Sequence, residues 1–162
     1  MPTVETAVNP ATALKLEQMR VIRAPRARVY EAWTNPEILA KWFGPANMEC
    51  PRAELDVRED GNYRVEVVST AKAIAENPEL AKRGGFAAGS YTKVVPNEML
   101  QFTWDPSWNP GELSLVTVLF EDVRGGTQVT IRHEKFLTEA SRDGHTNGWA
   151  GALEKLTAQL EA

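Results

Sequence analysis

The chain has 162 residues, the size of one domain with at most a short tail. Hydrophobic residues make up 43% of it, and 22 acidic against 18 basic residues give a formal net charge of −4. A negative overall field disfavours nucleic acid as a partner. The single cysteine, Cys50, excludes an internal disulfide and any site built from several cysteines, as is usual in a reducing cytoplasm.

The N-terminal segment is the first element along the chain. Residues 1–13 are small or polar, include two prolines and show no periodicity, which predicts a flexible N-terminal arm before a single domain over 14–162. They contain no apolar stretch of the length that a signal peptide needs, and the most apolar segment, 113–120, is too short to span a bilayer. We therefore expect a cytoplasmic protein with no membrane insertion.

The domain is predicted to begin with a strand over 14–23. Pro25 ends it and suits the first turn of a helix, and Val29 with Ala32 and Trp33 provides one apolar face at helical spacing. Asn35 followed by proline then restarts the chain as a second short helix, which runs to about residue 43. Two short helices therefore follow the first strand.

The middle of the chain changes to strand chemistry. In the last of its strands Val129, Ile131 and His133 share one face. This alternation predicts that their face of the strand is buried and that the opposite face is exposed to solvent. Short connections between the segments indicate antiparallel neighbours. The six predicted strands are 48–57, 61–69, 86–95, 99–104, 112–122 and 126–136.

The period becomes helical again from about residue 141. Trp149, Leu153, Leu156 and Leu160 form one apolar stripe of a long terminal helix. Gly144, Gly148 and Gly151 fall inside this helix, where each costs about 1 kcal/mol relative to alanine. Glycines at 148 and 151 suggest that another group comes close to the helix backbone. The element order predicts an α+β fold in which a curved antiparallel sheet of about six to seven strands wraps around this helix.

Several segments resemble one known family. The opening is carried by 20–25 (RVIRAP), 29–37 (VYEAWTNPE) and 42–45 (WFGP), and the ending by 127–133 and by Gly148-Trp149 with two leucines. These motifs are similar to the branch of the START-like (SRPBCC, birch-pollen-allergen-like) superfamily related to the activator of the heat-shock chaperone ATPase. The resemblance implies a helix-grip fold that encloses a hydrophobic cavity. Members of this superfamily differ widely in function, so the fold alone does not choose one.

Residues 69–85 depart from the family pattern. They are alanine-rich and helix-prone, are broken at Asn77-Pro78 and end at two glycines, so an insertion or enlarged loop is predicted here. Two interpretations remain open: a mobile lid in which Ile74 and Leu80 cover a cavity mouth, and an ordinary surface helix.

Common catalytic and metal-binding motifs do not occur in the sequence. There is no nucleophile elbow, Walker loop, dinucleotide fingerprint or HExxH pair, and only two histidines, His133 and His145, are present. We expect neither a metal nor a cofactor, and no residue is assigned as catalytic. No pair of carboxylates is placed together inside by the pattern, and Glu121, Asp122 and Glu134 fall at strand ends or on the outward face, where solvation explains them.

The inward aromatic residues and His133 form the candidate site. Large rings suit a pocket for a flat, mostly apolar ligand, and they equally suit a packed core. His133 is either a ligand-facing polar anchor or a core histidine with its hydrogen bonds satisfied. Trp108 lies in a loop between two prolines, typical of an exposed rim residue. The predicted ligand-binding residues are Tyr63, Tyr91, Phe102, Trp104, Val118, Ile131, His133 and Trp149.

Three functions are weighed. The first, which the sequence favours, is the binding of a small hydrophobic or aromatic ligand in a cavity between sheet and helix. The second is a cyclase- or dehydratase-like enzyme acting on a polyketide-like substrate, which needs a second polar group within reach of the ligand. The third is a chaperone-regulating interaction module, implied by the resemblance. A homodimer formed through the outer sheet face is consistent with all three.

Overall fold

The structure is a computed structural model that describes residues 14–162, so the predicted arm lies outside the described residues. Within this part no helix is long and apolar enough to cross a membrane. Its elements are β1 (Leu16–Ile22), α3 (Arg26–Thr34), α4 (Pro36–Trp42), β2 (Met48–Glu49), β3 (Ala53–Leu55), β4 (Asn62–Ser69), α5 (Ala71–Glu76), the 3-10 helix η1 (Pro78–Lys82), β5 (Gly84–Val95), β6 (Met99–Pro106), β7 (Ser114–Val123), β8 (Gly126–Glu134) and α6 (Glu139–Glu161).

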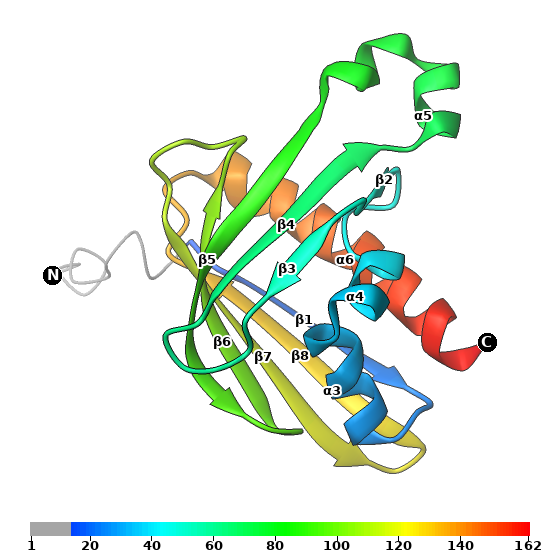
Figure 1. The fold of residues 1–162 in the computed structure, drawn as a ribbon, viewed down its shortest axis with the longest axis vertical. Helices are drawn as coiled ribbons and strands as arrows, with labels where there is room; N and C mark the ends of the chain where they lie inside the picture. The colour runs from blue at the N-terminus through cyan, green and yellow to red at the C-terminus, as the bar shows by residue number, and fades with distance from the viewer. Residues whose placement is uncertain (1–13) are drawn as a thin grey trace, which may run out of the picture.

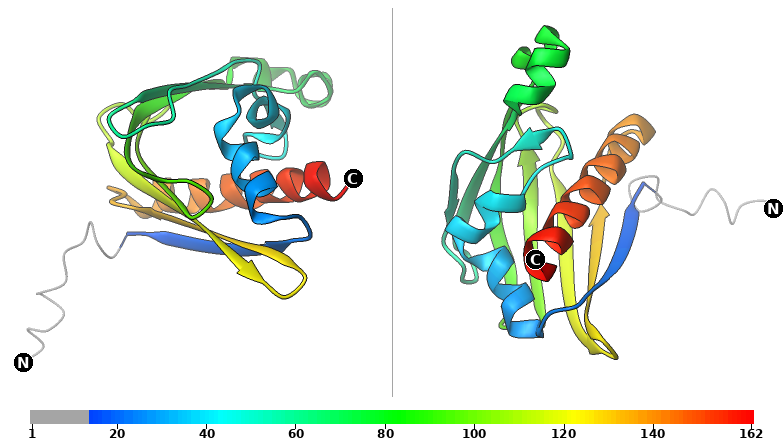
Figure 2. Two further views of the ribbon diagram at one scale, coloured as in Figure 1. Left: turned by 60° about the horizontal axis from the view of Figure 1, so that its bottom comes forward. Right: turned by 90° about the vertical axis from the view of Figure 1, so that its right-hand side faces the viewer.

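A strongly curled antiparallel sheet wraps around α6, as predicted (Figures 1 and 2). The strand order is β1-β8-β7-β6-β5-β4-β2, and β3 also pairs with β4. The helix lies against the concave face, and α3 and α4 close the open side of the half-barrel (Figure 2). The helix-grip prediction is therefore confirmed.

The predicted strand 48–57 is interrupted in the structure. Its two pieces, β2 and β3, are separated at Cys50-Pro51-Arg52, where proline lacks the backbone N–H that a continuous ladder requires. Both pieces pair with β4, and this division brings the sheet to eight strands.

The two short helices form where the sequence placed them. Val29, Ala32 and Trp33 of α3 are buried, in agreement with the predicted apolar face. The Asn35 side chain caps α4 by accepting hydrogen bonds from the backbone N–H groups of Glu37 and Ile38. These helices bring aromatic residues of the N-terminal third against the concave side of the sheet.

Helix α6 begins two residues earlier than predicted, because Thr138 caps it by accepting from the Ser141 N–H. The predicted stripe is buried, but every buried residue of α6 lies at or after Trp149. Gly151 explains the expected close approach: a Cβ there would lie 2.7 Å from the Ala46 backbone nitrogen. The first half of the helix is thus not packed into the core, whereas the second half is.

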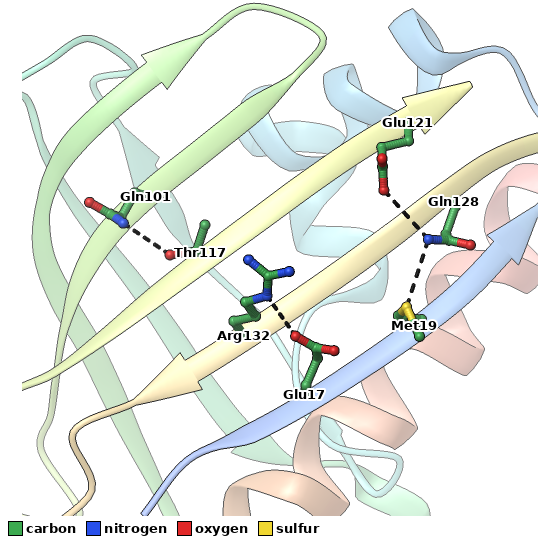
Figure 3. A network of polar contacts seen from close by, with 7 residues as sticks. All are labelled: Glu17, Met19, Gln101, Thr117, Glu121, Gln128 and Arg132. Atoms are coloured by element: carbon green, nitrogen blue, oxygen red, sulfur yellow. Dashed lines mark hydrogen bonds and ion pairs between the residues drawn. The ribbon is translucent and has the colours of Figure 1, made fainter. Parts of the chain in front are cut away.

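The two faces of the sheet differ as the alternation predicted, except that Thr130 and Thr117 of the outer face are also buried. On β8, Val129, Ile131 and His133 are fully buried. Figure 3 shows the outer face, where Arg132 pairs with Glu17 of β1 and neighbouring strands exchange further side-chain hydrogen bonds. The polar outer face leaves the concave side to form the core and the candidate site.

The predicted insertion forms α5 and η1, which project away from the sheet (Figure 1). Asn77 ends α5 and caps η1 through its side chain. The Ser69 hydroxyl donates to the Leu80 carbonyl at 2.7 Å, which ties the excursion back to the end of β4. The chain then re-enters the sheet at Gly84, so Lys82 and Arg83 stand at the junction.

Candidate functional site

A cavity of about 910 Å³ lies beside the first half of α6. This volume is within the range of pockets that hold drug-sized ligands. The cavity is bordered by the α4–β2 connection, the start of β5, the β6–β7 loop and α6. Aromatic rings form its deepest walls, contributed by Phe43, Trp104 and Trp149.

Small residues form the α6 side of the cavity. Ala140, Gly144, Gly148 and Ala152 follow one another at intervals of four, so they share one face of the helix, and all four line the cavity. A Cβ at Gly144 would meet no atom within 4 Å, and one at Gly148 would only reach ordinary contact with Pro45 Cγ at 3.5 Å. The cavity therefore exists partly because this helix face carries almost no side chain.

Two histidines hold the two cavity tryptophans in place. The Trp149 indole N–H donates to His133 Nδ1 at 3.0 Å, and the Trp104 indole N–H donates to His145 Nε2 at 3.2 Å. Rings of the two tryptophans are 5.4 Å apart between centroids. The orientation of both rings is thus fixed by hydrogen bonds as well as by packing.

His133 is fully buried, and both of its nitrogens have partners. Because Nδ1 accepts from Trp149, we assign the proton to Nε2, which donates to Ser114 Oγ at 2.7 Å. Burial, and next the proximity of His145, hold the pKa of His133 well below its usual value. If His133 were protonated, its Nδ1 would carry a hydrogen that points at the Trp149 N–H, and this hydrogen bond would be lost. The folded protein therefore favours the neutral imidazole.

This arrangement predicts that acid destabilises the protein through His133. Below about pH 6.5 the unfolded chain binds a proton that the folded chain excludes, so the unfolding free energy should fall as the pH is lowered, with a limiting slope of about 1.4 kcal/mol per pH unit. We expect a His133→Leu variant to show a shallower dependence in urea unfolding measured at several pH values. Equal slopes for the two proteins would contradict the assignment.

His145 is the second histidine and lines the cavity directly. Its Nδ1 donates to the Ser141 carbonyl at 2.8 Å, which leaves Nε2 as the acceptor for Trp104. Burial lowers the pKa of His145, and the hydrogen bond to Ser141 and the charge of Glu112 partly offset this effect. Both ring nitrogens are therefore engaged in structural hydrogen bonds.

A polar cluster forms part of the cavity wall near the start of α6. The Glu112 carboxylate is almost completely buried and accepts from the Ser141 hydroxyl at 2.5 Å and from the Leu137 N–H at 2.7 Å. The Asn109 amide donates to both Glu112 and Ser141. These bonds connect the β6–β7 loop to the beginning of α6.

A second, much smaller void of about 20 Å³ lies further inside, with Phe43 and Trp104 common to both linings. Tyr63, Tyr91 and Phe102 line this inner void, and the Tyr63 hydroxyl donates to the Thr103 carbonyl. Burial is the main reason that the pKa values of both tyrosines are raised. These phenols are therefore neutral groups in an apolar setting.

The predicted site residues fall into three groups. Trp104 and Trp149 line the large cavity; Tyr63, Tyr91 and Phe102, together with Trp104, line the inner void; Val118, Ile131 and His133 line neither. Trp108, predicted at a rim, lines the large cavity and is 38% exposed. Ile74 and Leu80 of the predicted insertion do not line it, whereas Lys82 and Arg83 do.

The sequence interpretation missed His145, the Glu112 cluster and the glycine face of α6. The spacing of Ala140, Gly144, Gly148 and Ala152 could have revealed the last of these, because four small residues in one register leave a helix face bare. The His145 pairing had no such signal, since it depends on how β6 meets α6. Within 14–162, no three His, Cys, Asp or Glu residues are grouped as a metal site would require.

Comparison with known proteins agrees with this architecture. Residues 23–161 match the family model described as Activator of Hsp90 ATPase homolog 1-like protein. Among solved structures, CV1439 from Chromobacterium violaceum is 26% identical, with a TM-score of 0.76 over 93% of this chain and 99% of that one. A Rhizobium leguminosarum protein is 26% identical, with a TM-score of 0.71 over 91% and 93% of the two chains.

A third solved structure, the AHSA1 protein of Silicibacter pomeroyi, shares the fold at 21% identity. Its TM-score is 0.75 over 91% of this chain and 97% of that one. No curated protein matches the sequence.

Proposed function

The chain belongs to the Activator of Hsp90 ATPase homolog 1-like family of the START-like superfamily, and the cavity is built on the fold of that superfamily. We propose that the protein binds a small hydrophobic or aromatic ligand in this cavity. The observation that carries the proposal is the cavity of about 910 Å³ beside the glycine face of α6. The mostly apolar lining of an open cavity of this size contacts water, and a bound apolar molecule would remove that surface from water, which is favourable.

In this proposal the ligand lies between the helix face and the aromatic wall. Trp104 and Trp149 contact it directly, and Trp108 covers it from the rim. Tyr63, Tyr91 and Phe102 line the inner void beyond Phe43 and Trp104, and they contact a part of the ligand that reaches past these two rings. Val118, Ile131 and His133 support these rings from behind, with His133 acting through its bond to Trp149.

The test begins with mass spectrometry of the purified protein under native and then denaturing conditions. We expect a co-purified small molecule that is lost on unfolding. In parallel, the uncharged fluorophore N-phenylnaphthylamine (NPN) is titrated into delipidated protein, and we expect saturable binding of one molecule with quenching of tryptophan fluorescence. If no molecule co-purifies and NPN shows no saturable binding, the proposal is wrong.

A second candidate, an acid–base enzyme of the cyclase or dehydratase kind, draws support from the polar groups in the cavity wall. His145, Ser141 and Glu112 are close together there. However, both nitrogens of His145 are engaged, and the Glu112 carboxylate accepts from three donors. Proton transfer to a ligand would require breaking these bonds, so binding is the function that the geometry supports better.

The third candidate, regulation of a chaperone, takes its support from the family name alone. Recognition of a large partner usually relies on aromatic anchors in a well-packed patch. Here the exposed apolar residues near the cavity, among them Trp108 and Leu137, line the mouth itself. They are accounted for by ligand entry.

A further inference from the structure

The cavity carries positively charged side chains on one side of its mouth. Lys82 and Arg83 end the α5–η1 excursion and line the cavity at the point where the chain enters β5. We propose that the ligand is an amphipathic anion, an inference that rests on the proposed function. The apolar, ring-containing part of the ligand occupies the cavity, and its carboxylate, sulfonate or similar group pairs with Arg83.

Arg83 is available for such a pairing. Lys82 already has an acidic neighbour, Glu79, with Nζ 3.4 Å from its carboxylate. By contrast, no carboxylate of residues 14–162 lies within ion-pair distance of the Arg83 guanidinium. An arginine presents a planar fork of donors that matches a carboxylate or a sulfonate, so it can bind such a group with two hydrogen bonds.

The backbone position of Arg83 is well defined. Its N–H donates to the Leu80 carbonyl at 3.0 Å, and that same carbonyl accepts from the Ser69 hydroxyl. Gly84 follows immediately and pairs with Val68 of β4. The arginine is therefore anchored on both sides at the cavity edge, while its side chain remains exposed to solvent.

The other charges on the cavity favour the same ligand. Glu112 is the acidic residue of the lining, and its carboxylate already accepts hydrogen bonds from Leu137, Ser141 and Asn109. Burial lowers the pKa of His145, which disfavours a positive charge there, and its Nε2 accepts from the Trp104 indole. The free charge at the mouth is thus positive, although the whole chain carries a formal net charge of −4.

Two related fluorophores test the inference. NPN and anilinonaphthalene sulfonate (ANS) share the same rings, but only ANS carries a sulfonate. Hydrophobic transfer alone favours the uncharged NPN, and the negative protein repels ANS at long range. We nevertheless expect ANS to bind at least as tightly as NPN, and an Arg83→Gln variant to lose about five- to tenfold in ANS affinity with no change for NPN.

Arg124→Gln is the matched control, because it removes the same charge from an exposed turn between β7 and β8, outside the cavity lining. It should leave both affinities unchanged. Raising the salt concentration from about 0.01 M to about 1 M shortens the screening length from about 30 Å to about 3 Å and should weaken ANS alone.

The results separate the two levels of the proposal. If neither fluorophore binds, the proposed cavity function fails. If NPN binds well but ANS is weaker, or if Arg83→Gln weakens ANS no more than Arg124→Gln does, the cavity binds ligands but the anion inference is wrong.

Discussion

Filling the cavity from the α6 side is expected to abolish ligand binding while leaving the fold at least as stable. In a Gly144→Leu/Gly148→Leu variant both side chains project from the bare helix face into the cavity. We expect NPN affinity to fall at least about thirtyfold, equivalent to about 2 kcal/mol. Each glycine replaced in the helix interior adds about 1 kcal/mol of helix propensity, which offsets local crowding. Fluorescence titration and urea unfolding measure the two quantities.

Two further variants separate cavity filling from general effects on the helix. Gly144→Ala/Gly148→Ala gains helix propensity but adds only two methyl groups, so it should be more stable and still bind NPN. Gly151→Ala should behave oppositely, because its Cβ would lie 2.7 Å from the Ala46 nitrogen on a face that does not line the cavity. It should lose stability and retain affinity. NPN affinity unchanged in the double leucine variant would show that binding occurs elsewhere.

Removing the His133 ring is expected to produce the largest loss of stability, about 2–4 kcal/mol for His133→Leu. The Trp149 indole N–H would be left buried without an acceptor, and Ser114 would lose its donor. Trp149→Phe removes the indole N–H instead and leaves His133 Nδ1 unpaired. We expect it to cost a comparable amount, to which the loss of ring volume contributes.

The double variant His133→Leu/Trp149→Phe distinguishes a hydrogen bond from simple packing. Replacing both partners by apolar groups leaves neither one unsatisfied, so the double variant should be about 1–2 kcal/mol more stable than the sum of the single losses predicts. Urea unfolding of the four proteins at neutral pH gives this coupling energy. Strictly additive losses would mean that the indole–imidazole bond contributes nothing.

Most of the fold could be predicted from the sequence because its signals are local. The alternation of Val129, Ile131 and His133 defined the buried face of β8, and the Asn35-Pro36 pair defined the start of α4. The break within 48–57 was missed although Pro51 marks it, since the flanking residues alternate as a strand should. Helix α6 begins early because Thr138 caps it, and a single polar capping residue cannot be recognised from the spacing of apolar residues.

The candidate site was less accessible to prediction, for a physical reason. Inward-facing residues can be recognised from alternation, but whether they meet an open space depends on the side chains that face them. Trp104 and Trp149 border the cavity because α6 presents glycines there, whereas Ile131 meets the packed core. Contacts such as Trp104 with His145 join residues 41 positions apart and left no mark on local periodicity.

The uneven burial of α6 has a consequence for how the protein moves. From Trp149 onward the helix is held by the core, whereas no side chain of residues 139–148 is fully buried. Hydrogen bonds connect these first turns to the body: Ser141 with Glu112 and Asn109, His145 with Trp104, and the Thr146 carbonyl with Gln18. Opening of these first turns therefore requires much less free energy than unfolding of the domain. Local fraying of this helix end would let a ligand enter and leave the cavity. The rate of ligand exchange would then be independent of the free energy of unfolding of the whole domain.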